Sequence, residues 1–204
     1  MRVVSRVSDE AVSTTASPRQ RLKAERTDLL LREAARLFAQ RGYRGVSLEE
    51  LASAVGISGP ALYRHFPNKE AILAEVLDDV SRRLRDGGQA RVAAAADPRA
   101  ALESLVDFHA DFALGETDHI RVHNRDLRTL ADEPAEQVRR TQREYVELWV
   151  EQLVAVQGID RDLARLKAQA AIGLLNSTPH SVRHGDPVVV KPVLVQMTLA
   201  ALLS

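Results

Sequence analysis

The chain has no cysteine among its 204 residues, which excludes a disulfide scaffold, a thiolate metal site and a cysteine nucleophile. It also lacks any apolar run close to the roughly 20 residues that a helix needs to cross a bilayer. The first residues, MRVVSRVSDEAVSTTASPRQ, lack the apolar core of a signal peptide. We therefore expect a cytoplasmic protein without a membrane partner.

Net charge is also absent, because 28 basic residues balance 28 acidic ones. The two signs are nevertheless segregated. Residues 19–70 carry ten Lys or Arg and six Asp or Glu, an excess of +4. Residues 71–204 carry sixteen basic and twenty acidic residues, a balance of −4, and residues 1–18 carry two of each. This distribution is typical of a protein that contacts phosphates through its N-terminal part only.

Residues 47–66, SLEELASAVGISGPALYRHF, carry the clearest pattern in the chain. Ser47 is placed to cap a helix, and Glu50 follows at the spacing of a capping box. Gly56 stands where that helix would end in a left-handed residue. A second short helix is expected over about 58–65. Two short helices joined by a glycine turn predict a helix-turn-helix, whose second helix enters the major groove of DNA.

This stretch resembles the N-terminal domain of the TetR family of transcriptional regulators. The likeness extends from LREAARLFAQRGYRGVSLEELA through VGISGPALYRHFPNKEAIL, or roughly residues 20 to 75. It includes the family's aromatic pair, at Tyr63 and Phe66, and its lysine, at Lys69. The resemblance implies a homodimer that binds double-stranded operator DNA and a variable C-terminal domain that binds a small-molecule effector.

The expected DNA contacts lie on the capped helix end, on the recognition helix and just after it. Ser58, Pro60 and Ala61 would face base edges, where they can offer one hydrogen bond and apolar contacts to a thymine methyl. Arg64 is the one long donor, to a base or to a phosphate. The full set is Ser47, Ser58, Gly59, Pro60, Ala61, Tyr63, Arg64, His65 and Lys69.

Two alternative roles are open for several of these residues. Ser47 serves as a helix cap, and the same helix end offers free amides to a phosphate. By resemblance Tyr63, His65 and Lys69 hold phosphates, while partial burial against the first helix is the alternative for Tyr63 and His65. A basic arm before or at the start of the first helix reaches DNA or is simply solvated; it comprises Arg19, Arg21 and Lys23.

The rest of the chain predicts helices separated by Pro and Gly, so the fold class is all-α. We expect a disordered tail over 1–18, a three-helix DNA-binding head over 19–67, and a larger helical ligand-binding and dimerisation domain over 68–204. The first helix should run from about Arg19 or Arg21 to Arg41. The later helices are expected over 69–94, 98–113, 118–130, 135–157, 160–178 and 188–203.

Aromatic residues make up only 4% of the chain, so their positions are informative. Phe108 and Phe112 lie four apart on one helix, as Tyr145 and Trp149 do on another. These side chains either line a ligand cavity or belong to a packed core. The residues expected to bind an effector are Phe108, Phe112, Arg121, His123, Tyr145, Trp149, Gln152 and Asn176.

Polar groups in the body leave further alternatives open. Arg121 and His123 either face an acidic group of a ligand or are solvated and paired with nearby aspartates. Zinc is not expected, since His119 and His123 lack further ligands. Asn176 begins a polar kink, NSTP, which either touches a ligand or partner or satisfies backbone groups freed by the break. No cofactor or metal is expected.

The last two helices carry more apolar surface than a monomer needs to cover, which predicts a homodimer through them. Their apolar residues include Leu166, Ala170, Leu174, Val189, Val193, Met197 and Leu202. The leading hypothesis is a repressor that a small hydrophobic or acyl-type effector releases from its operator by shifting the helix 69–94. The alternative is a constitutive DNA binder with a packed, ligand-free body. An enzyme is not expected, since the chain has no GxSxG, P-loop, GxGxxG or zinc signature.

Overall fold

The computed structural model describes residues 17–178 and 186–204, and the regular structure in these ranges is helical. The head contains α1 (Pro18–Arg41), a 3₁₀ turn (Tyr43–Gly45), α2 (Leu48–Ala54) and α3 (Gly59–Tyr63). The body contains α4 (Lys69–Ala94), α5 (Pro98–Gly115), α6 (Thr117–Asp126), a 3₁₀ turn (Leu127–Thr129), α7 (Asp132–Gln157), α8 (Arg161–Leu175) and α10 (Pro187–Leu203). The expected all-α fold, with an N-terminal helix-turn-helix head and a larger helical C-terminal domain, is confirmed.

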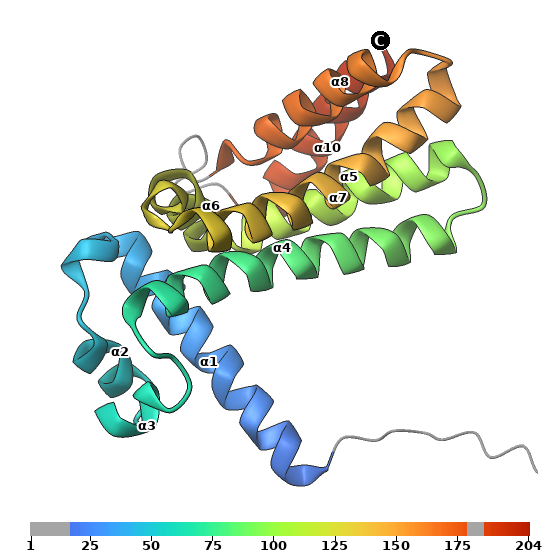
Figure 1. Cartoon of the computed structure of the whole chain (residues 1–204). Coiled ribbons are helices and arrows are strands. Elements are labelled where there is room, and N and C mark those ends of the chain that lie inside the picture. The colour runs from blue at the N-terminus through green and yellow to red at the C-terminus, as the bar shows by residue number, and fades with distance from the viewer. Residues whose placement is uncertain (1–16, 179–185) are drawn as a thin grey trace, which may run out of the picture.

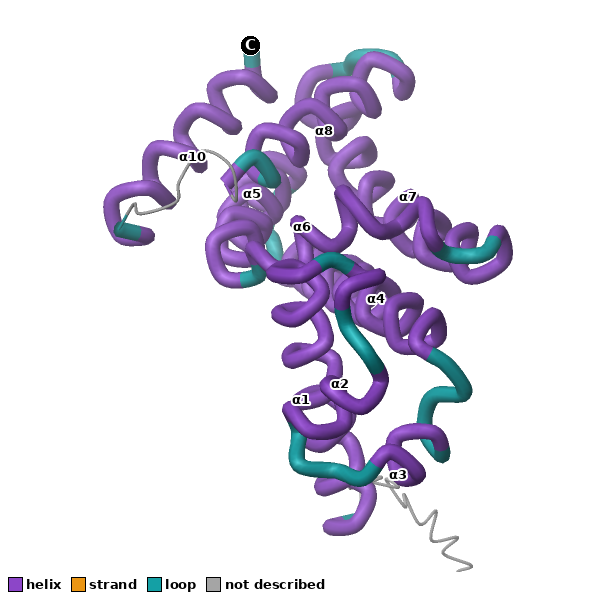
Figure 2. The backbone as a smooth tube through the Cα atoms, turned by 90° about the vertical axis from the view of Figure 1, so that its left-hand side faces the viewer, coloured by secondary structure: helices purple, strands orange, loops and turns teal. Residues whose placement is uncertain are grey.

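The long helix α4 joins the two parts of the molecule (Figure 1). It begins beside the head and packs against α7 and α5 along the body. The helices α8 and α10 pack against each other at the end of the body away from the head, as both views show (Figures 1 and 2). A second connection between head and body is the contact of α1 with α6.

Helix ends in the body differ most from the sequence expectations at three places. α7 begins at Asp132 rather than at 135, because Pro134 falls in the first turn, where its missing N–H costs no hydrogen bond. α8 ends at Leu175 rather than at 178, and Ser177 Oγ donates to the freed carbonyl of Leu174 at 2.7 Å. The helix expected over 118–130 is α6 followed by a 3₁₀ turn.

Two differences also occur in the head. The recognition helix α3 covers only Gly59–Tyr63, although the amides of His65 and Phe66 still donate to the Leu62 carbonyl, each at 2.9 Å. The first helix begins at Pro18, which the sequence assigned to the tail. Residues 1–16 of that tail lie outside the described residues.

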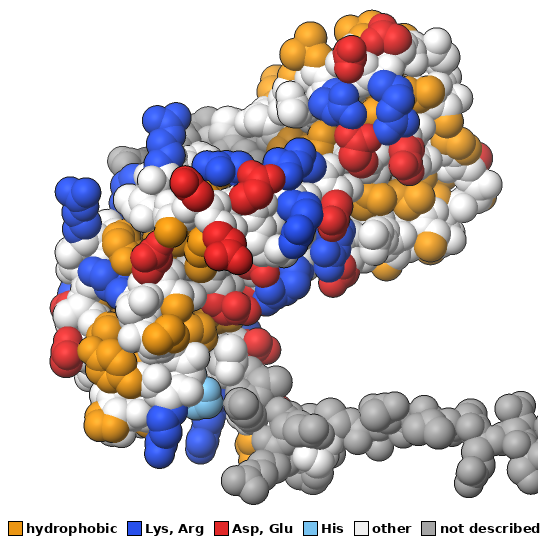
Figure 3. Space-filling view, in the orientation of Figure 1, with side chains coloured by type: hydrophobic (Ala, Val, Ile, Leu, Met, Phe, Trp, Pro, Cys, Tyr) orange, Lys and Arg blue, Asp and Glu red, His pale blue; other side chains and the backbone are white. Residues whose placement is uncertain are grey.

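The surface shows how charge is distributed over the two parts (Figure 3). Lys, Arg, Asp and Glu side chains are intermixed over the body, whereas basic side chains and a histidine lie together at the end of the head. Within the described ranges, no helix is both long enough and apolar enough to span a membrane.

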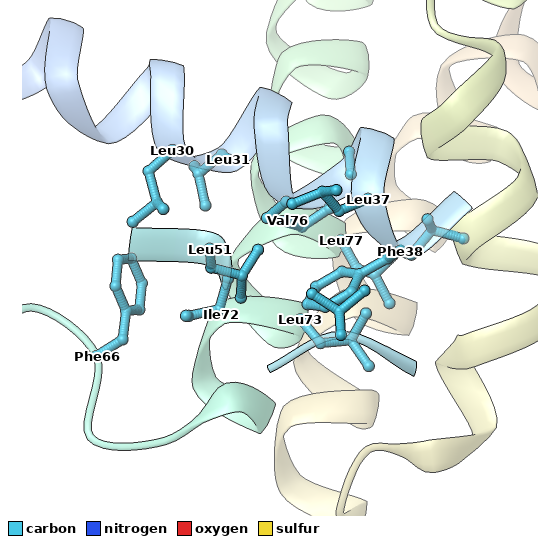
Figure 4. Close-up of a cluster of buried hydrophobic side chains, with 14 of the residues drawn as sticks. Leu30, Leu31, Leu37, Phe38, Leu51, Phe66, Ile72, Leu73, Val76 and Leu77 are labelled. Carbon is cyan, nitrogen blue, oxygen red and sulfur yellow. The ribbon is translucent and has the colours of Figure 1, made fainter. Parts of the chain in front are cut away.

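Two clusters of buried apolar side chains hold the fold together. The first lies under the helix-turn-helix, where Leu30 and Leu31 of α1 and Leu51 of α2 meet residues of α4 (Figure 4). Eight of its nineteen buried members lie beyond residue 67, on α4, α6, α7 and the 3₁₀ region between them. The second cluster fills the body between α5, α7, α8 and α10.

Candidate functional site

The first helix of the helix-turn-helix is fixed at both ends by local hydrogen bonds. Ser47 Oγ accepts from the Glu50 amide at 3.2 Å, and Glu50 Oε2 accepts from the Ser47 amide at 2.8 Å, which completes the expected capping box. These bonds lower the pKa of the Glu50 carboxyl, which also binds Arg41 of α1 at 2.6 Å. At the other end Gly56 adopts φ +68°, as expected for the turn.

The turn after α2 sets the direction of the recognition helix. The Ile57 amide donates to the Ala52 carbonyl at 3.0 Å and the Gly56 amide to the Ser53 carbonyl at 3.1 Å, the paired bonds of a Schellman motif. Leu62 of α3 is fully buried and anchors this helix on the head core. The remaining faces of α3 are consequently turned away from the core.

Most of the predicted DNA-contacting side chains are exposed around α3. Tyr63 is 52% exposed, so about half of its surface is accessible to a partner. Ser58 makes no capping bond with its side chain, which leaves its hydroxyl available to another partner. The exposed members of the set are Ser47, Ser58, Pro60, Tyr63, Arg64 and His65, while Gly59 and Ala61 are half-buried.

Lys69 differs from the others because it has partners inside the head. Its ammonium donates to the Val46 carbonyl at 2.7 Å and lies 4.6 Å from the centre of the Tyr43 ring. Burial, with a smaller effect of Glu70, raises the pKa of Tyr43. Lys69 therefore ties the start of α4 to the residue just before the α2 cap. The side chains of the predicted basic arm, Arg19, Arg21 and Lys23, lie outside what the structure describes.

The contact between α1 and α6 has a polar part that centres on Arg125. Its guanidinium donates to the carbonyls of Phe38 and Ala39, at the last turn of α1, where a cation interacts favourably with the helix dipole. It also pairs with the buried carboxylate of Asp126 at 2.7 Å. Arg125 thus holds the C-terminal end of α1 against the body.

Inside the body, four of the predicted effector residues meet around a histidine that the sequence analysis missed. His109 of α5 hydrogen-bonds Tyr145 Oη through Nδ1 at 3.0 Å and Asn176 Oδ1 through Nε2 at 3.1 Å. The rings of Phe112, Tyr145 and Trp149 lie 5.6, 5.7 and 6.0 Å from the His109 ring. His109 belongs to the inward stripe of α5, so an isolated polar residue in an apolar stripe was the available signal.

The side chains at this centre are buried, which both alternatives, a ligand cavity and a packed core, require. His109, Tyr145 and Trp149 are 1%, 4% and 0% exposed. Burial lowers the pKa of His109 to about 4 and raises that of Tyr145, so both are neutral near pH 7. Phe108 packs on α4, where a Cβ added to Gly87 would lie 2.4 Å from its Cζ.

Arg121 pairs with an aspartate, as one of its two alternatives predicted, whereas His123 contacts a glutamine instead of an aspartate. Arg121 pairs with Asp118 at 3.4 Å, and His123 Nε2 lies 2.6 Å from Gln142 Nε2. Gln152 is half-buried on α7. In the described part of the chain no three His, Asp or Glu residues are grouped closely enough to hold a metal ion, while His180 and His184 lie outside it.

Two surface hollows accompany these sites, and none of the predicted effector residues lines either. One, of about 440 Å³, lies between α7 and α8; its lining residues are Arg139, Gln142, Arg143, Val146, Glu147, Arg165 and Gln169. The other, of about 740 Å³, lies between α1 and the turn and recognition helix, with Leu22, Arg26, Leu29, Ile57, Ala61 and Arg64 among its walls.

The outer faces of α8 and α10 expose apolar side chains. Leu166 is 63% exposed and Val193 51%. Leu202, which the sequence analysis grouped with them, is instead 1% exposed and packs in the body core. The other large exposed apolar residues here are Leu163, Val188, Val189 and Met197.

Comparisons with known proteins match both parts of the chain. Residues 30–76 match the family model "Bacterial regulatory proteins, tetR family", and residues 95–180 match "Tetracyclin repressor-like, C-terminal domain". The transcriptional repressor KstR2 of Rhodococcus jostii is 33% identical over 133 residues, 63% of each chain. KstR2 of Mycobacterium tuberculosis is 32% identical over 143 residues, 67% of this chain and 68% of that protein. The match thus spans less than two thirds of the first of these relatives.

Solved structures of similar fold include two with bound acyl thioesters. FadR of Bacillus subtilis in complex with stearoyl-CoA has a TM-score of 0.70 at 17% identity, covering 85% of this chain and 98% of that one. AibR in complex with isovaleryl coenzyme A and operator DNA has a TM-score of 0.69 at 23% identity, covering 84% and 97%. At these identities the likeness shows the fold alone.

Proposed function

The chain belongs to the TetR family of bacterial regulatory proteins, and from this premise we propose that it is an effector-responsive repressor that binds operator DNA as a homodimer. One observation supports the DNA-binding part of this proposal. The capping box and Schellman turn hold α3 with Leu62 inward and Tyr63, Arg64 and His65 exposed at the basic end of the head. This is the geometry with which a recognition helix enters the major groove.

Arg64 is the residue with which to test DNA binding. We would measure fluorescence anisotropy on the chain's own upstream DNA at two salt concentrations, for the wild type and Arg64→Ala. If Arg64 contacts a phosphate, its loss should weaken binding on all sequences and reduce the salt slope by about 1. If it contacts a base, its loss should cost about 1–3 kcal/mol on the specific site alone.

Arg99→Ala is the matched control, because Arg99 is an exposed arginine on the body that is bonded to Glu103, four residues away, at 3.2 Å. It should leave the affinity unchanged. Equal binding to operator and random DNA by the wild type would contradict sequence-specific recognition.

The exposed apolar faces of α8 and α10 support the proposed homodimer. Pairing these faces between two copies would bury Leu166 and Val193 and set two recognition helices to read two half-sites, about 34–36 Å apart or a multiple of this. Light scattering after size-exclusion chromatography should give twice the chain mass. Leu166→Glu should give the monomer mass and weaken operator binding, whereas a monomeric wild type would contradict the proposal.

The effector part rests on the buried cluster around His109 and on the likeness to proteins solved with acyl-CoA. A small hydrophobic or acyl-type molecule that enters this cluster would press against Tyr145, whose ring lies against Gly88 of α4. Since α4 begins at Lys69, which binds the Val46 carbonyl, a shift of α4 would reach the helix-turn-helix directly. Such a shift is limited by the effector's difference in affinity for the two states.

Stearoyl-CoA and isovaleryl-CoA are the first probes for this step, with free coenzyme A as the control. An acyl-CoA effector should lower operator affinity while coenzyme A does not. Saturating acyl-CoA that leaves operator affinity unchanged would contradict an acyl-CoA effector.

The complete burial of large side chains in the body favours a second candidate, a constitutive DNA binder without an effector. Trp149, Leu102 and Leu153 are fully buried and pack together with the rest of the body core. Thermal denaturation against a panel of metabolites separates the two candidates. An effector-binding protein is stabilised by at least one compound, and a solid core by none.

A further inference from the structure

The polar cluster inside the body costs free energy that a purely apolar core would avoid. Tyr145 and Trp149 lie in the same buried cluster as Leu105 and Leu153, and the His109 ring packs against both of them; at most 4% of each of these three polar residues is exposed. Buried polar groups are tolerated when every donor finds an acceptor. Whether that condition holds here follows from the direction of each hydrogen bond.

The direction of the bonds is set by Asn176. Its Oδ1 accepts only, so His109 Nε2 carries the hydrogen and donates to it. His109 Nδ1 is then an acceptor and receives the only proton of the Tyr145 hydroxyl. The Trp149 Nε1–H lies near the Tyr145 oxygen, where it opposes the effect of burial on the Tyr145 pKa, but it does not reach hydrogen-bond geometry. Among the described residues it has no acceptor.

The cluster also contains no ionised group. Burial lowers the pKa of His109 to about 4 and raises that of Tyr145, so neither carries charge near pH 7. Phe112 and the surrounding leucines are apolar. A carboxylate or phosphate placed here would be a buried charge without a partner, which is far costlier than a neutral oxygen. One unpaired N–H donor in an uncharged aromatic site fits a neutral hydrogen-bond acceptor.

We propose that the Trp149 Nε1–H binds a neutral carbonyl oxygen of the effector, while the chain from Tyr145 through His109 to Asn176 holds the surrounding groups in position. The effector class is then an apolar ketone, ester or acyl thioester, and not the corresponding free acid. This inference rests on the effector-responsive function proposed above. It assigns His109 to the effector site as a positioning residue, since it acts through Tyr145 and Asn176.

The chain has a single tryptophan, so ¹⁵N-labelled protein gives one indole N–H signal, which reports on this donor alone. Three six-carbon probes separate the chemistry: 2-hexanone offers a neutral carbonyl, hexanoate a charged carboxylate, and hexane no acceptor. Hexanoyl-CoA, with free coenzyme A as its control, tests whether the carbonyl is also accepted as a thioester on a large carrier. Apparent affinities come from the same titrations.

We expect 2-hexanone to move the indole proton signal downfield and to bind about fivefold more tightly than hexane, the effect of one neutral hydrogen bond. Hexanoate at pH 7.5 should leave the signal in place. In Trp149→Phe, followed by thermal shift, the advantage of the ketone over hexane should fall to about one. If hexanoyl-CoA shifts the indole signal, the effector class includes acyl thioesters. If hexanoyl-CoA leaves the signal unmoved, the class is restricted to free ketones and esters.

The inference is overturned if 2-hexanone leaves the indole signal unmoved, if hexanoate binds best, or if Trp149→Phe keeps the preference for the ketone. The indole titration uses the wild-type protein, so it remains decisive if Trp149→Phe fails to fold. Operator binding is measured on the same sample. Specific operator binding with an unresponsive indole signal refutes the carbonyl site alone, whereas absent operator binding refutes the proposed function.

Discussion

Gly88, in the middle of α4, allows α4 and α7 to approach each other closely. A Cβ added at this position would lie 2.8 Å from Tyr145 Cε2 and 3.0 Å from Leu148 Cδ1, both on α7. Leu148 ends in a flexible methyl, but the Tyr145 ring is 4% exposed and its hydroxyl is bonded to His109. We therefore expect Gly88→Ala to destabilise the protein, although alanine is the better helix former.

The two opposing effects can be compared. Overpacking a filled interior costs about 1–3 kcal/mol. Replacing glycine by alanine inside a helix returns about 1 kcal/mol. Because the Tyr145 ring cannot swing away without losing its bond to His109, the cost should lie toward the upper end, leaving a net loss of about 2 kcal/mol. For a chain of this size that lowers Tm by roughly 4–8 °C.

Thermal and urea denaturation at one fixed protein concentration measure this difference, since dimerisation would make Tm depend on concentration. Gly115→Ala is the matched control, because Gly115 also belongs to a helix and a Cβ there meets nothing within 4 Å. The control should be neutral or slightly stabilising. If Gly88→Ala proves as stable as Gly115→Ala, the close packing of α4 against α7 at Gly88 is refuted.

Three further predictions concern the cap, the buried histidine and the α1–α6 contact. Ser47→Ala should cost about 1 kcal/mol in urea denaturation, because it removes half of the capping box. The pKa of His109 is about 6.5 in the unfolded state and about 4 in the folded state. The unfolded state therefore binds a proton first, and the free energy of unfolding should fall by up to about 3 kcal/mol as pH drops from 6.5 to 4. His109→Gln should lose that dependence in denaturation curves between pH 7 and 5. Glu116 does not interfere in this range, because folding lowers its pKa from 4.5 to about 2 and the stability that it contributes is lost only below about pH 5. Arg125→Gln should cost about 1–3 kcal/mol by the same assay, because it leaves the Asp126 carboxylate buried without its partner.

The helix-turn-helix was predictable because its determinants are local. Ser47 and Glu50 lie three residues apart, and Gly56 supplies the positive φ that ends α2. Each of these signals is contained within one turn of chain, so a single sequence reveals them. The same is true of the helix α4, whose cap Asn68 accepts from the Ala71 amide at 2.8 Å.

The centre of the body was only partly predictable because its contacts join distant parts of the chain. Tyr145 and Trp149 were identified from their spacing, but His109 acquires its role from residues 36 and 67 positions away. Nothing in the sequence near His109 distinguishes a bonded histidine from an isolated one. The contact of Lys69 was unpredictable for the same reason, because its bond to the Val46 carbonyl spans 23 residues.

The core beneath the head has a consequence for how such proteins can be recombined. Since eight of its nineteen buried side chains come from beyond residue 67, a DNA-reading module cut at that point would lose Ile72, Leu73, Val76 and Leu77 together. Exchanging operator specificity between relatives would therefore require transplanting the exposed residues of α3 onto an intact chain. Swapping whole heads would instead place the core side chains of one protein's head against those of another protein's body, whose shapes do not complement each other.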